Sequence, residues 1–231
     1  HSVALAPEAG SQRLRRVINK HLGEEELVRA VETLIDGGIL NLKLYFMVGL
    51  PTETDDDVAE LIDLAKLLRQ QVVSFAKAKG RLGQVTVSLN AFVPKPWTPF
   101  QWEPMAPLKL IKERMTRIKT RLKRLANLKV TTDVPKYARL QAALSRGDRR
   151  LAPLIATLVR DPQPQRAEAA LNLDLDFYAA RRRGRDELLP WAFVDHGLSP
   201  EYLWTEAQRA LGAKESPPCD TEKCKRCGVC A

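Results

Sequence analysis

Three apolar segments, each separated from the next by a longer stretch with helical periodicity, constrain the fold of this chain more than any other feature. They lie at residues 2–6, 39–49 and 84–93. The middle segment ends in an almost unbroken apolar run, as a strand that is buried on both faces does. Strands that alternate with helices of this length form parallel βαβ units with right-handed crossovers. The sequence therefore predicts an α/β fold built on a parallel sheet.

The segments between and after these strands carry the periodicity and the end signals of helices. Thr54 and Asp57 resemble a capping box at the start of one of them, and the pair Gly37-Gly38 ends another. We expect helices at residues 12–20, 24–36, 55–70, 108–127, 136–144, 151–159, 167–183 and 200–211, and a short fourth strand at 128–132.

Three parallel strands make neither a closed barrel nor a sheet with protected edges, because at least one edge strand stays unpaired. The chain also opens directly inside a strand. We therefore expect the sequence to be a piece of a longer polypeptide, with earlier βα units before residue 1.

The net charge of +9 is concentrated in residues 108–150, where 14 Lys and Arg residues stand against three acids. Such a segment is either a solvated helix face or a surface that attracts nucleic acid or another anion, and both interpretations stay open. The sequence contains no apolar run of the ~20 residues that a membrane helix needs and no signal segment at its start. We expect a cytoplasmic protein without membrane contact.

All four cysteines lie near the end of the chain: Cys219, Cys224, Cys227 and Cys230. A disulfide framework would spread cysteines through the fold, whereas clustered thiolates are typical of a metal site. Four thiolates bind zinc or an iron–sulfur cluster. The Cys-x2-Cys-x2-Cys spacing favours the cluster, with zinc as the close alternative and a reduced, disordered tail as the third.

Four short motifs resemble motifs of a known protein family. They are APEAGS at residues 6–11, VINK at 17–20, YFMVGLPTET at 45–54 and FVPKPWTPFQW at 92–102. In this order they resemble the second half of a radical S-adenosylmethionine (SAM) domain, and in particular an uncharacterised, B12-binding type of radical SAM protein that ends in a cysteine-rich tail. The resemblance implies the second half of a partial (β/α)6 TIM-like barrel at residues 1–105. A basic, mainly helical extension at 106–212 and a metal-binding tail with four cysteines at 213–231 would follow.

The resemblance also implies a chemistry. Radical SAM enzymes hold a [4Fe–4S] cluster on a Cys-x3-Cys-x2-Cys loop and reduce SAM to a 5′-deoxyadenosyl radical. That loop is absent from this sequence, so we expect the chain alone to be inactive and to depend on an N-terminal half of the same polypeptide. Cobalamin would be held by an upstream domain, and no catalytic residue is assigned here.

The substrate is not identified by the sequence. Some related enzymes modify RNA, and the basic segment at residues 108–150 is compatible with RNA. The alternative function is a non-catalytic nucleic-acid-binding or assembly module whose tail metal is structural.

Six residues are candidates for the SAM site by their match to family positions. Glu8 would accept hydrogen bonds from the ribose, or else it is a helix-start charge. Lys20 would face the SAM carboxylate, with Arg16 as a competitor and a solvated lysine as the alternative. Tyr45 would lie near the ribose or in the core. The group that would line the adenine is Asn90, Ala91 and Phe92, although Phe92 alone also suits a core position.

Three further motifs look like family signatures to which the sequence assigns no chemistry. They are RGDRR at residues 146–150, RRR at 181–183 and DELLPW at 186–191.

Overall fold

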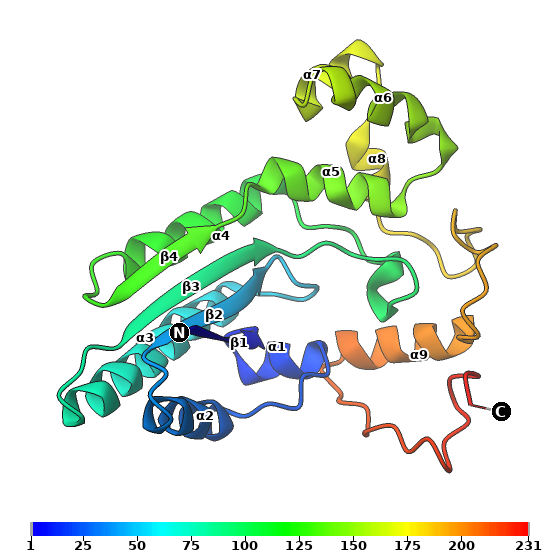
Figure 1. Cartoon of the computed structure of the whole chain (residues 1–231). Helices are drawn as coiled ribbons and strands as arrows, with labels where there is room; N and C mark the ends of the chain where they lie inside the picture. The colour runs from blue at the N-terminus through cyan, green and yellow to red at the C-terminus, as the bar shows by residue number, and fades with distance from the viewer. Residues whose placement is uncertain (1, 231) are drawn as a thin grey trace.

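The computed structural model describes residues 2–230, and its centre is a parallel sheet of four strands in the order β1-β2-β3-β4 (Figure 1). The strands are β1 (Ser2–Glu8), β2 (Asn41–Val48), β3 (Gln84–Ala91) and β4 (Leu128–Thr132). Each pairs in parallel with the next. The predicted parallel α/β fold is confirmed, and the partial barrel stays a prediction.

Helices connect the strands and then form the second half of the chain. They are α1 (Gln12–Val17), α2 (Glu24–Asp36), α3 (Asp55–Ala78), α4 (Leu108–Leu122), α5 (Pro135–Arg146), α6 (Ala152–Arg160), α7 (Pro164–Ala170), α8 (Leu175–Ala179) and α9 (Pro200–Leu211), with short 3-10 turns η1 (Pro99–Trp102) and η2 (Arg149–Leu151).

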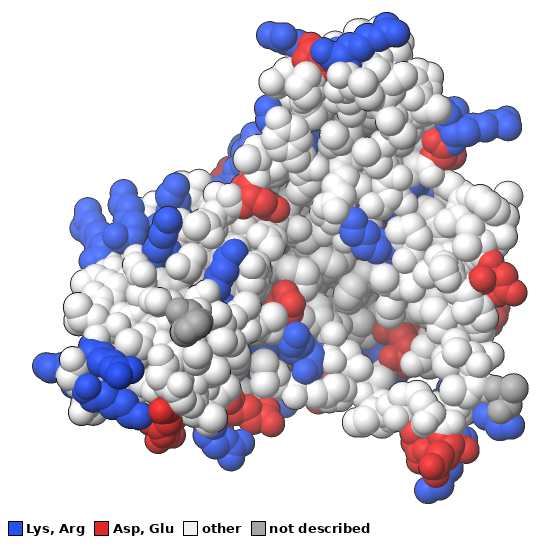
Figure 2. Space-filling model, viewed as in Figure 1, with Lys and Arg blue, Asp and Glu red and all other residues white. Residues whose placement is uncertain are grey.

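The two faces of the sheet differ in chemistry. Leu44 and Phe46 of β2 and Leu89 of β3 are buried in one apolar core with residues of α2, α3 and α4. Side chains alternate along a strand, so Tyr45 of β2 and its partner Ser88 of β3 lie on the opposite face. This second face is polar, and Figure 2 shows the molecule hollowed in front of the strand ends, between the region of α5 and that of α1 and α9.

Four expected helices differ from the structure by more than two residues. The helix expected at 12–20 ends at Val17, shortly before the left-handed Asn19, and the one expected at 108–127 ends at Leu122. The helix expected at residues 167–183 is two short helices, α7 and α8, because Asn172 takes a left-handed backbone (φ 47°) and Asp174 caps a new helix. The helix expected at 55–70 continues to Ala78, since Val72 and Ala76 remain buried against the core.

The sheet continues past residue 105, where we expected the barrel portion to end. The strand β4 pairs with β3, and the core includes Ile118 and Leu122 of the intervening helix α4. The expected boundary at 105/106 therefore cuts through a βαβ unit.

The turn after β2 is built around one buried carboxylate. The backbone N–H groups of Gly49 and Leu50 donate to Glu53 Oε2 at 2.6 and 3.0 Å, and Arg114 of α4 donates to Glu53 Oε1 at 3.1 Å. Gly49 has a φ of 87°, a conformation that glycine adopts without steric cost. The Gly-Leu-Pro-x-Glu-Thr motif is thus explained by backbone and charge contacts.

The last helix returns to the strand ends. Leu203 and Ala207 of α9 bury Trp102 of η1 in a separate apolar cluster. Beyond α9, the Ser216 N–H donates to the Asn19 side chain at 2.8 Å. The part of the FVPKPWTPFQW motif that holds Trp97 and Trp102 is therefore packed against α9. None of the helices between residues 2 and 230 combines the length and apolar character of a membrane span.

Candidate functional site

The end of β1 carries a carboxylate in an unusual backbone position. Glu8 has a left-handed φ of 65° and follows an irregularity in the pairing of β1 with β2 between Leu5 and Glu8. Its side chain is 28% exposed, and Lys20 Nζ lies 4.0 Å from Glu8 Oε1. Burial raises the pKa of Glu8, and the charge of Lys20 offsets part of this effect. The structure thus brings together two of the predicted SAM-site residues.

The loop after Glu8 is held by a buried arginine. Arg15 donates to the carbonyl oxygens of Ala9 and Gly10 at 3.1 and 2.6 Å, and to that of Leu22 at 2.8 Å. The neighbouring Arg16 is exposed and lines a small cavity of about 240 Å³ beside α9. Of the two cations that we considered for the SAM carboxylate, Lys20 is the one that lies at Glu8.

A second network ties the start of α1 to the start of α3. Ser11 Oγ donates to Asp57 Oδ1 at 2.5 Å, Arg13 forms an ion pair with the same carboxylate, and the Thr54 N–H donates to it at 2.7 Å. Burial opposes ionisation, but these hydrogen bonds outweigh it and lower the pKa of Asp57 to about 2. This depressed pKa stabilises the fold above about pH 4, and the contribution is lost as the pH falls through 2. The predicted capping box is confirmed.

The chain immediately after β1, β2 and β3 meets in one small apolar cluster. Ala9, Leu50 and Phe92 follow these three strands and pack together with Leu14 and Val17 of α1. Phe92 also stands edge-on to Phe100 of η1, with ring centroids 5.6 Å apart. Phe92 is therefore a core residue at the strand ends, 8% exposed.

Tyr45 and Asn90 lie on the polar face of the sheet, on neighbouring strands. Tyr45 pairs with Ser88 and Met47 with Asn90 in the β2–β3 register. The Lys43 ammonium lies 4.6 Å from the centroid of the Tyr45 ring. Within residues 2–230, neither the Tyr45 hydroxyl nor the Asn90 amide has a hydrogen-bond partner, so both polar groups are available to a ligand.

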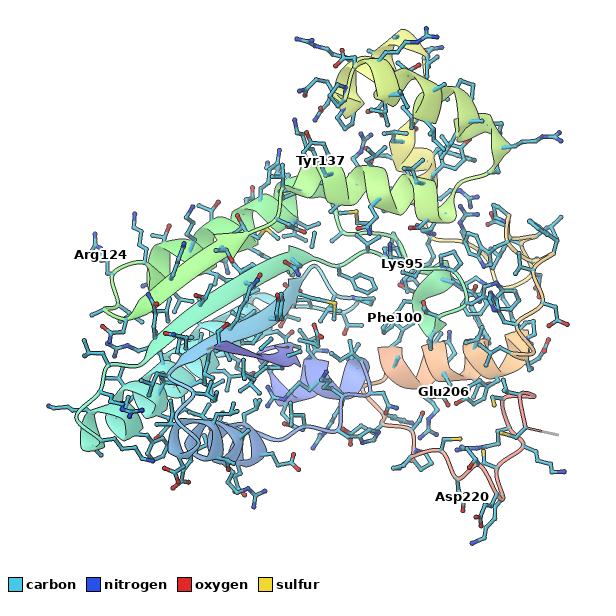
Figure 3. The ribbon with its side chains drawn as sticks, in the orientation of Figure 1. Lys95, Phe100, Arg124, Tyr137, Glu206 and Asp220 are labelled. Carbon is cyan, nitrogen blue, oxygen red and sulfur yellow. The ribbon has the colours of Figure 1, made fainter. Side chains whose placement is uncertain are left out.

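Two strand-end residues that the sequence reasoning missed complete this region. Asp133 comes directly after β4; its Oδ2 accepts the Ala91 N–H at 3.0 Å, while its buried Oδ1 has no partner among residues 2–230. Lys95 donates to Ser145 Oγ of α5 at 3.0 Å, and burial lowers its pKa. Figure 3 shows Lys95 beside the hollow, between α5 and η1. The sequence signal that could have identified Asp133 and Lys95 was their position just beyond the ends of strands.

The four tail cysteines are all free thiols. Arg226 Nε lies 3.3 Å from Cys224 Sγ, and the Cys227 carbonyl accepts the Ser199 N–H at 2.8 Å, which fixes the tail to the start of α9. Between residues 2 and 230, no three His, Cys, Asp or Glu side chains are grouped as metal ligands. The metal site of the four cysteines stays a prediction.

Comparison with known proteins gives two matches. The model of the radical SAM superfamily matches residues 1–65, a span that contains β1, β2, Glu8 and Lys20. The uncharacterized protein MJ0966 of Methanocaldococcus jannaschii is 42% identical over 102 residues, which are 44% of this chain and 21% of that protein. The chain therefore covers about a fifth of the length of this curated relative. No solved structure matches. The superfamily match at residues 1–65 agrees with the resemblance that the sequence motifs carry, and this part of the chain is similar to radical SAM proteins.

Proposed function

We propose that this chain forms one wall of the SAM site of a radical SAM enzyme, with the [4Fe–4S] cluster ligands and a B12-binding domain supplied by sequence outside residues 1–231. The observation that carries the proposal is the pair of Glu8 and Lys20 at the end of β1. Ligands of parallel α/β folds bind at the carboxyl ends of strands. In this family the bound SAM, reduced by the cluster, supplies the radical.

The charges at β1 match the polar groups of SAM. Glu8 accepts no hydrogen bond from residues 2–230, so its carboxylate can accept from the ribose hydroxyls, and charge-assisted hydrogen bonds of this kind are strong. The Lys20 ammonium, 4.0 Å away, is placed to bind the SAM carboxylate. The left-handed backbone at Glu8 (φ 65°) costs free energy for a residue other than glycine, as is common at functional sites.

The ends of β2 and β3 supply the surface for the adenine. Met47 is partly exposed and packs against the apolar cluster that contains Phe92, and the Asn90 amide can donate and accept. The Ala91 N–H is already bonded to Asp133, so only the carbonyl of Ala91 remains for the ligand.

Calorimetric titration of SAM into the native full-length protein, without reductant, tests the proposal. Glu8→Gln and Lys20→Met should each raise the Kd about tenfold or more, because each removes a charge-assisted contact. The matched variants Glu32→Gln and Lys77→Met change exposed charges on α2 and α3 and should leave the Kd unchanged. Unchanged SAM affinity in both site variants, with parental melting temperatures, would refute the assignment.

We also propose that the four cysteines of the tail hold a metal. The donor set of four thiols fits zinc or an iron–sulfur cluster, and the contact of Cys227 with Ser199 anchors the segment that would close around it. Metal analysis and the visible spectrum of anaerobically purified protein separate the two. If the parent protein contains one zinc per chain and shows no visible absorbance, and Cys227→Ser loses that zinc, the metal is zinc and not an iron–sulfur cluster.

A further inference from the structure

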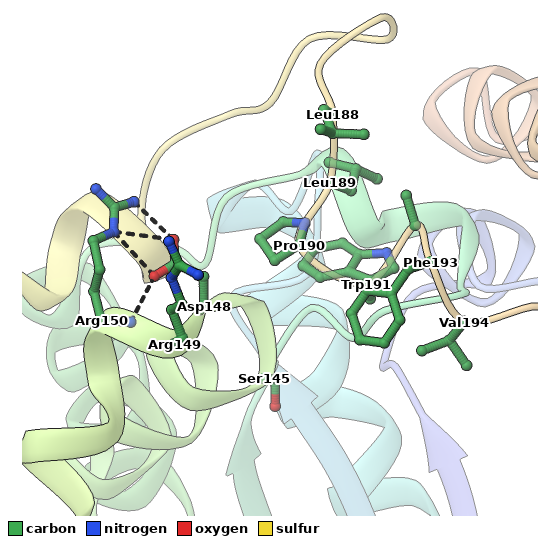
Figure 4. A pocket seen from close by; sticks show the side chains of 12 residues that line it. Ser145, Asp148, Arg149, Arg150, Leu188, Leu189, Pro190, Trp191, Phe193 and Val194 are labelled. Atoms are coloured by element: carbon green, nitrogen blue, oxygen red, sulfur yellow. Dashed lines mark hydrogen bonds and ion pairs between the residues drawn. The ribbon is translucent and has the colours of Figure 1, made fainter.

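The three motifs to which the sequence assigned no chemistry converge on one pocket. The pocket has a volume of about 870 Å³ and is lined by Ser145, residues 147–150 and residues 188–194 (Figure 4). The RRR motif lies directly behind this lining, because Arg183 NH2 donates to the Arg146 carbonyl. Segments about forty residues apart in the sequence therefore build a single cavity.

One wall of the pocket is apolar and aromatic. Trp191 is fixed there by a hydrogen bond from its Nε1 to Gln101 Oε1 at 2.7 Å and by the Arg183 guanidinium, 5.2 Å from its ring centroid. Leu188 and Phe193 are 86% and 87% exposed. Exposed apolar side chains of this size, grouped at a cavity, mark a binding surface.

The opposite wall is cationic. Arg150 is bound to Asp148 at 2.7 Å, whereas Arg149 is exposed and forms no ion pair within residues 2–230. Behind this wall Arg146 is fully buried and Arg183 is 4% exposed. The Nε of each has no hydrogen-bond partner in the part of the chain that the structure describes.

The acids nearby neutralise only part of this charge. Arg146 donates to backbone, to the carbonyls of Ala179 and Arg181 at 2.7 and 2.9 Å, and not to a carboxylate. Glu187 is shared between Arg181 and, at 3.7 Å, Arg183. The desolvated guanidinium groups therefore give the pocket a positive potential, because charges in a low-dielectric setting are weakly screened.

Glycine at position 147 keeps this wall in place. A Cβ there would lie 2.2 Å from Leu151 Cδ1 and 2.7 Å from the Ala143 carbonyl. Where the backbone turns from α5 into η2, the space at position 147 is too small for any side chain. Asp148 and Arg149 follow this turn and line the pocket.

The pocket is connected to the strand ends. Ser145 lines the pocket, and its hydroxyl oxygen accepts a hydrogen bond from the Lys95 ammonium at 3.0 Å. Lys95 follows closely on the end of β3. This hydrogen bond joins the wall of the pocket to the segment that follows β3.

We infer that this pocket binds the substrate of the enzyme, a molecule with an apolar or aromatic body and a carboxylate or phosphate group. The body packs on Trp191 and Phe193, and the anion faces Arg149. That the ligand is a substrate rests on the proposed function, whereas the presence of a binding site does not.

Two fluorescent probes of the same shape test the inference. The anionic probe is 8-anilinonaphthalene-1-sulfonate, and the neutral one is N-phenyl-1-naphthylamine. The parent protein should bind the anion at least about tenfold more tightly than the neutral probe, a difference of one charged contact. Arg149→Gln should remove that preference, and Phe193→Ser should weaken both probes.

Matched variants separate this pocket from the rest of the surface. Arg160→Gln changes an exposed arginine of α6, and Leu82→Ser changes an apolar side chain that is 83% exposed elsewhere. Neither should alter binding. Equal affinity for the two probes, or equal losses in the matched variants, would overturn the inference.

Phosphate and carboxylate competitors identify the anion. Naphthyl phosphate and naphthoate each displace the anionic probe if the pocket accepts both groups, and failure of both to displace it contradicts the inference. Glu8→Gln should leave probe binding unchanged, so a failure of the SAM site and a failure of the pocket are distinguishable.

Discussion

One buried arginine of the sheet region, Arg114, and one of the helical region that follows residue 134, Arg146, are held by different partners. In the first region, a buried arginine meets a carboxylate: Arg114 pairs with Glu53. In the second, the buried Arg146 is bonded to carbonyl oxygens, and burial, with the charges of Arg183 and Arg181, lowers its pKa to about 10. The first arrangement fixes strand ends, whereas the second retains uncompensated positive charge at a cavity.

The largest effect should come from breaking the ion pair of the first region. Arg114→Met leaves the Glu53 carboxylate buried without its cation, and we expect the free energy of unfolding to fall by about 4 kcal/mol. The double variant Glu53→Gln/Arg114→Met removes the uncompensated charge and should recover part of the loss. Urea unfolding measures both. A loss below about 1 kcal/mol would show that the pair does not stabilise the strand ends.

The matching change in the second region should cost less. Arg146→Met leaves two carbonyls without a donor but relieves the repulsion from Arg181 and Arg183, so we expect a loss of about 2 kcal/mol. Trp191 and Trp204 lie after residue 134, and Trp97 and Trp102 stand edge-on to His196 and Trp204 of the same region. In Arg146→Met, the midpoint urea concentration of the fluorescence transition should therefore be lower than that of the far-ultraviolet circular dichroism transition. In Arg114→Met, the two midpoints should fall together. Coincident shifts in both variants would show that the two regions unfold as one.

The smallest effect on stability should come from the basic surface of α4 and β4, where Figure 2 shows grouped Lys and Arg side chains. Five of the 14 basic residues at 108–150 are buried or paired: Arg114, Arg117, Arg139, Arg146 and Arg150. The others leave the RNA hypothesis testable. Changing Lys119, Lys123 and Arg124 to Gln should lower the salt slope of single-stranded RNA binding by about 2, with little change in stability.

The control for that experiment changes equal charge elsewhere. Arg29, Lys77 and Arg81 are cations on and after α2 and α3, and their replacement by Gln should leave the slope unchanged. Equal slopes in the two triple variants would favour the interpretation of 108–150 as a solvated face.

Periodicity was sufficient for the strands and for helices with clear end signals. Residues 39–49 and 84–93 were predicted from their apolar content and from the turn and helix signals on either side. The expectation that the first of these strands is buried on both faces is corrected by the structure, because alternate residues of β2 are only half-buried on the polar face. The helix at 200–211 was predicted within the observed bounds, Pro200–Leu211, since Ser199-Pro200 and Gly212 mark its ends. The break at Asn172 was missed, although residues 171–177 (LNLDLDF) alternate apolar and polar side chains at a spacing of two, which does not fit one continuous helix.

The sites were predicted less completely, because their partners come from distant segments. The resemblance proposed Glu8 and Lys20, which the structure places together. Sequence spacing gave no reason to join Lys95 to Ser145 or Asp133 to Ala91, since each contact spans more than forty residues. Buried arginines such as Arg15 are also hidden from composition, because their hydrogen bonds go to backbone carbonyls that every residue has.

The outer side of β1 has a consequence for assembly. Among residues 2–230, β1 is hydrogen-bonded to β2 alone, so one row of its peptide groups is open to a further strand. An added strand would extend the curved surface on which Tyr45 and Asn90 lie and would stand next to Glu8. Under the proposed function, a chain that docks there would form part of the wall around SAM, and the identity of that neighbour would decide how much solvent reaches the nucleoside.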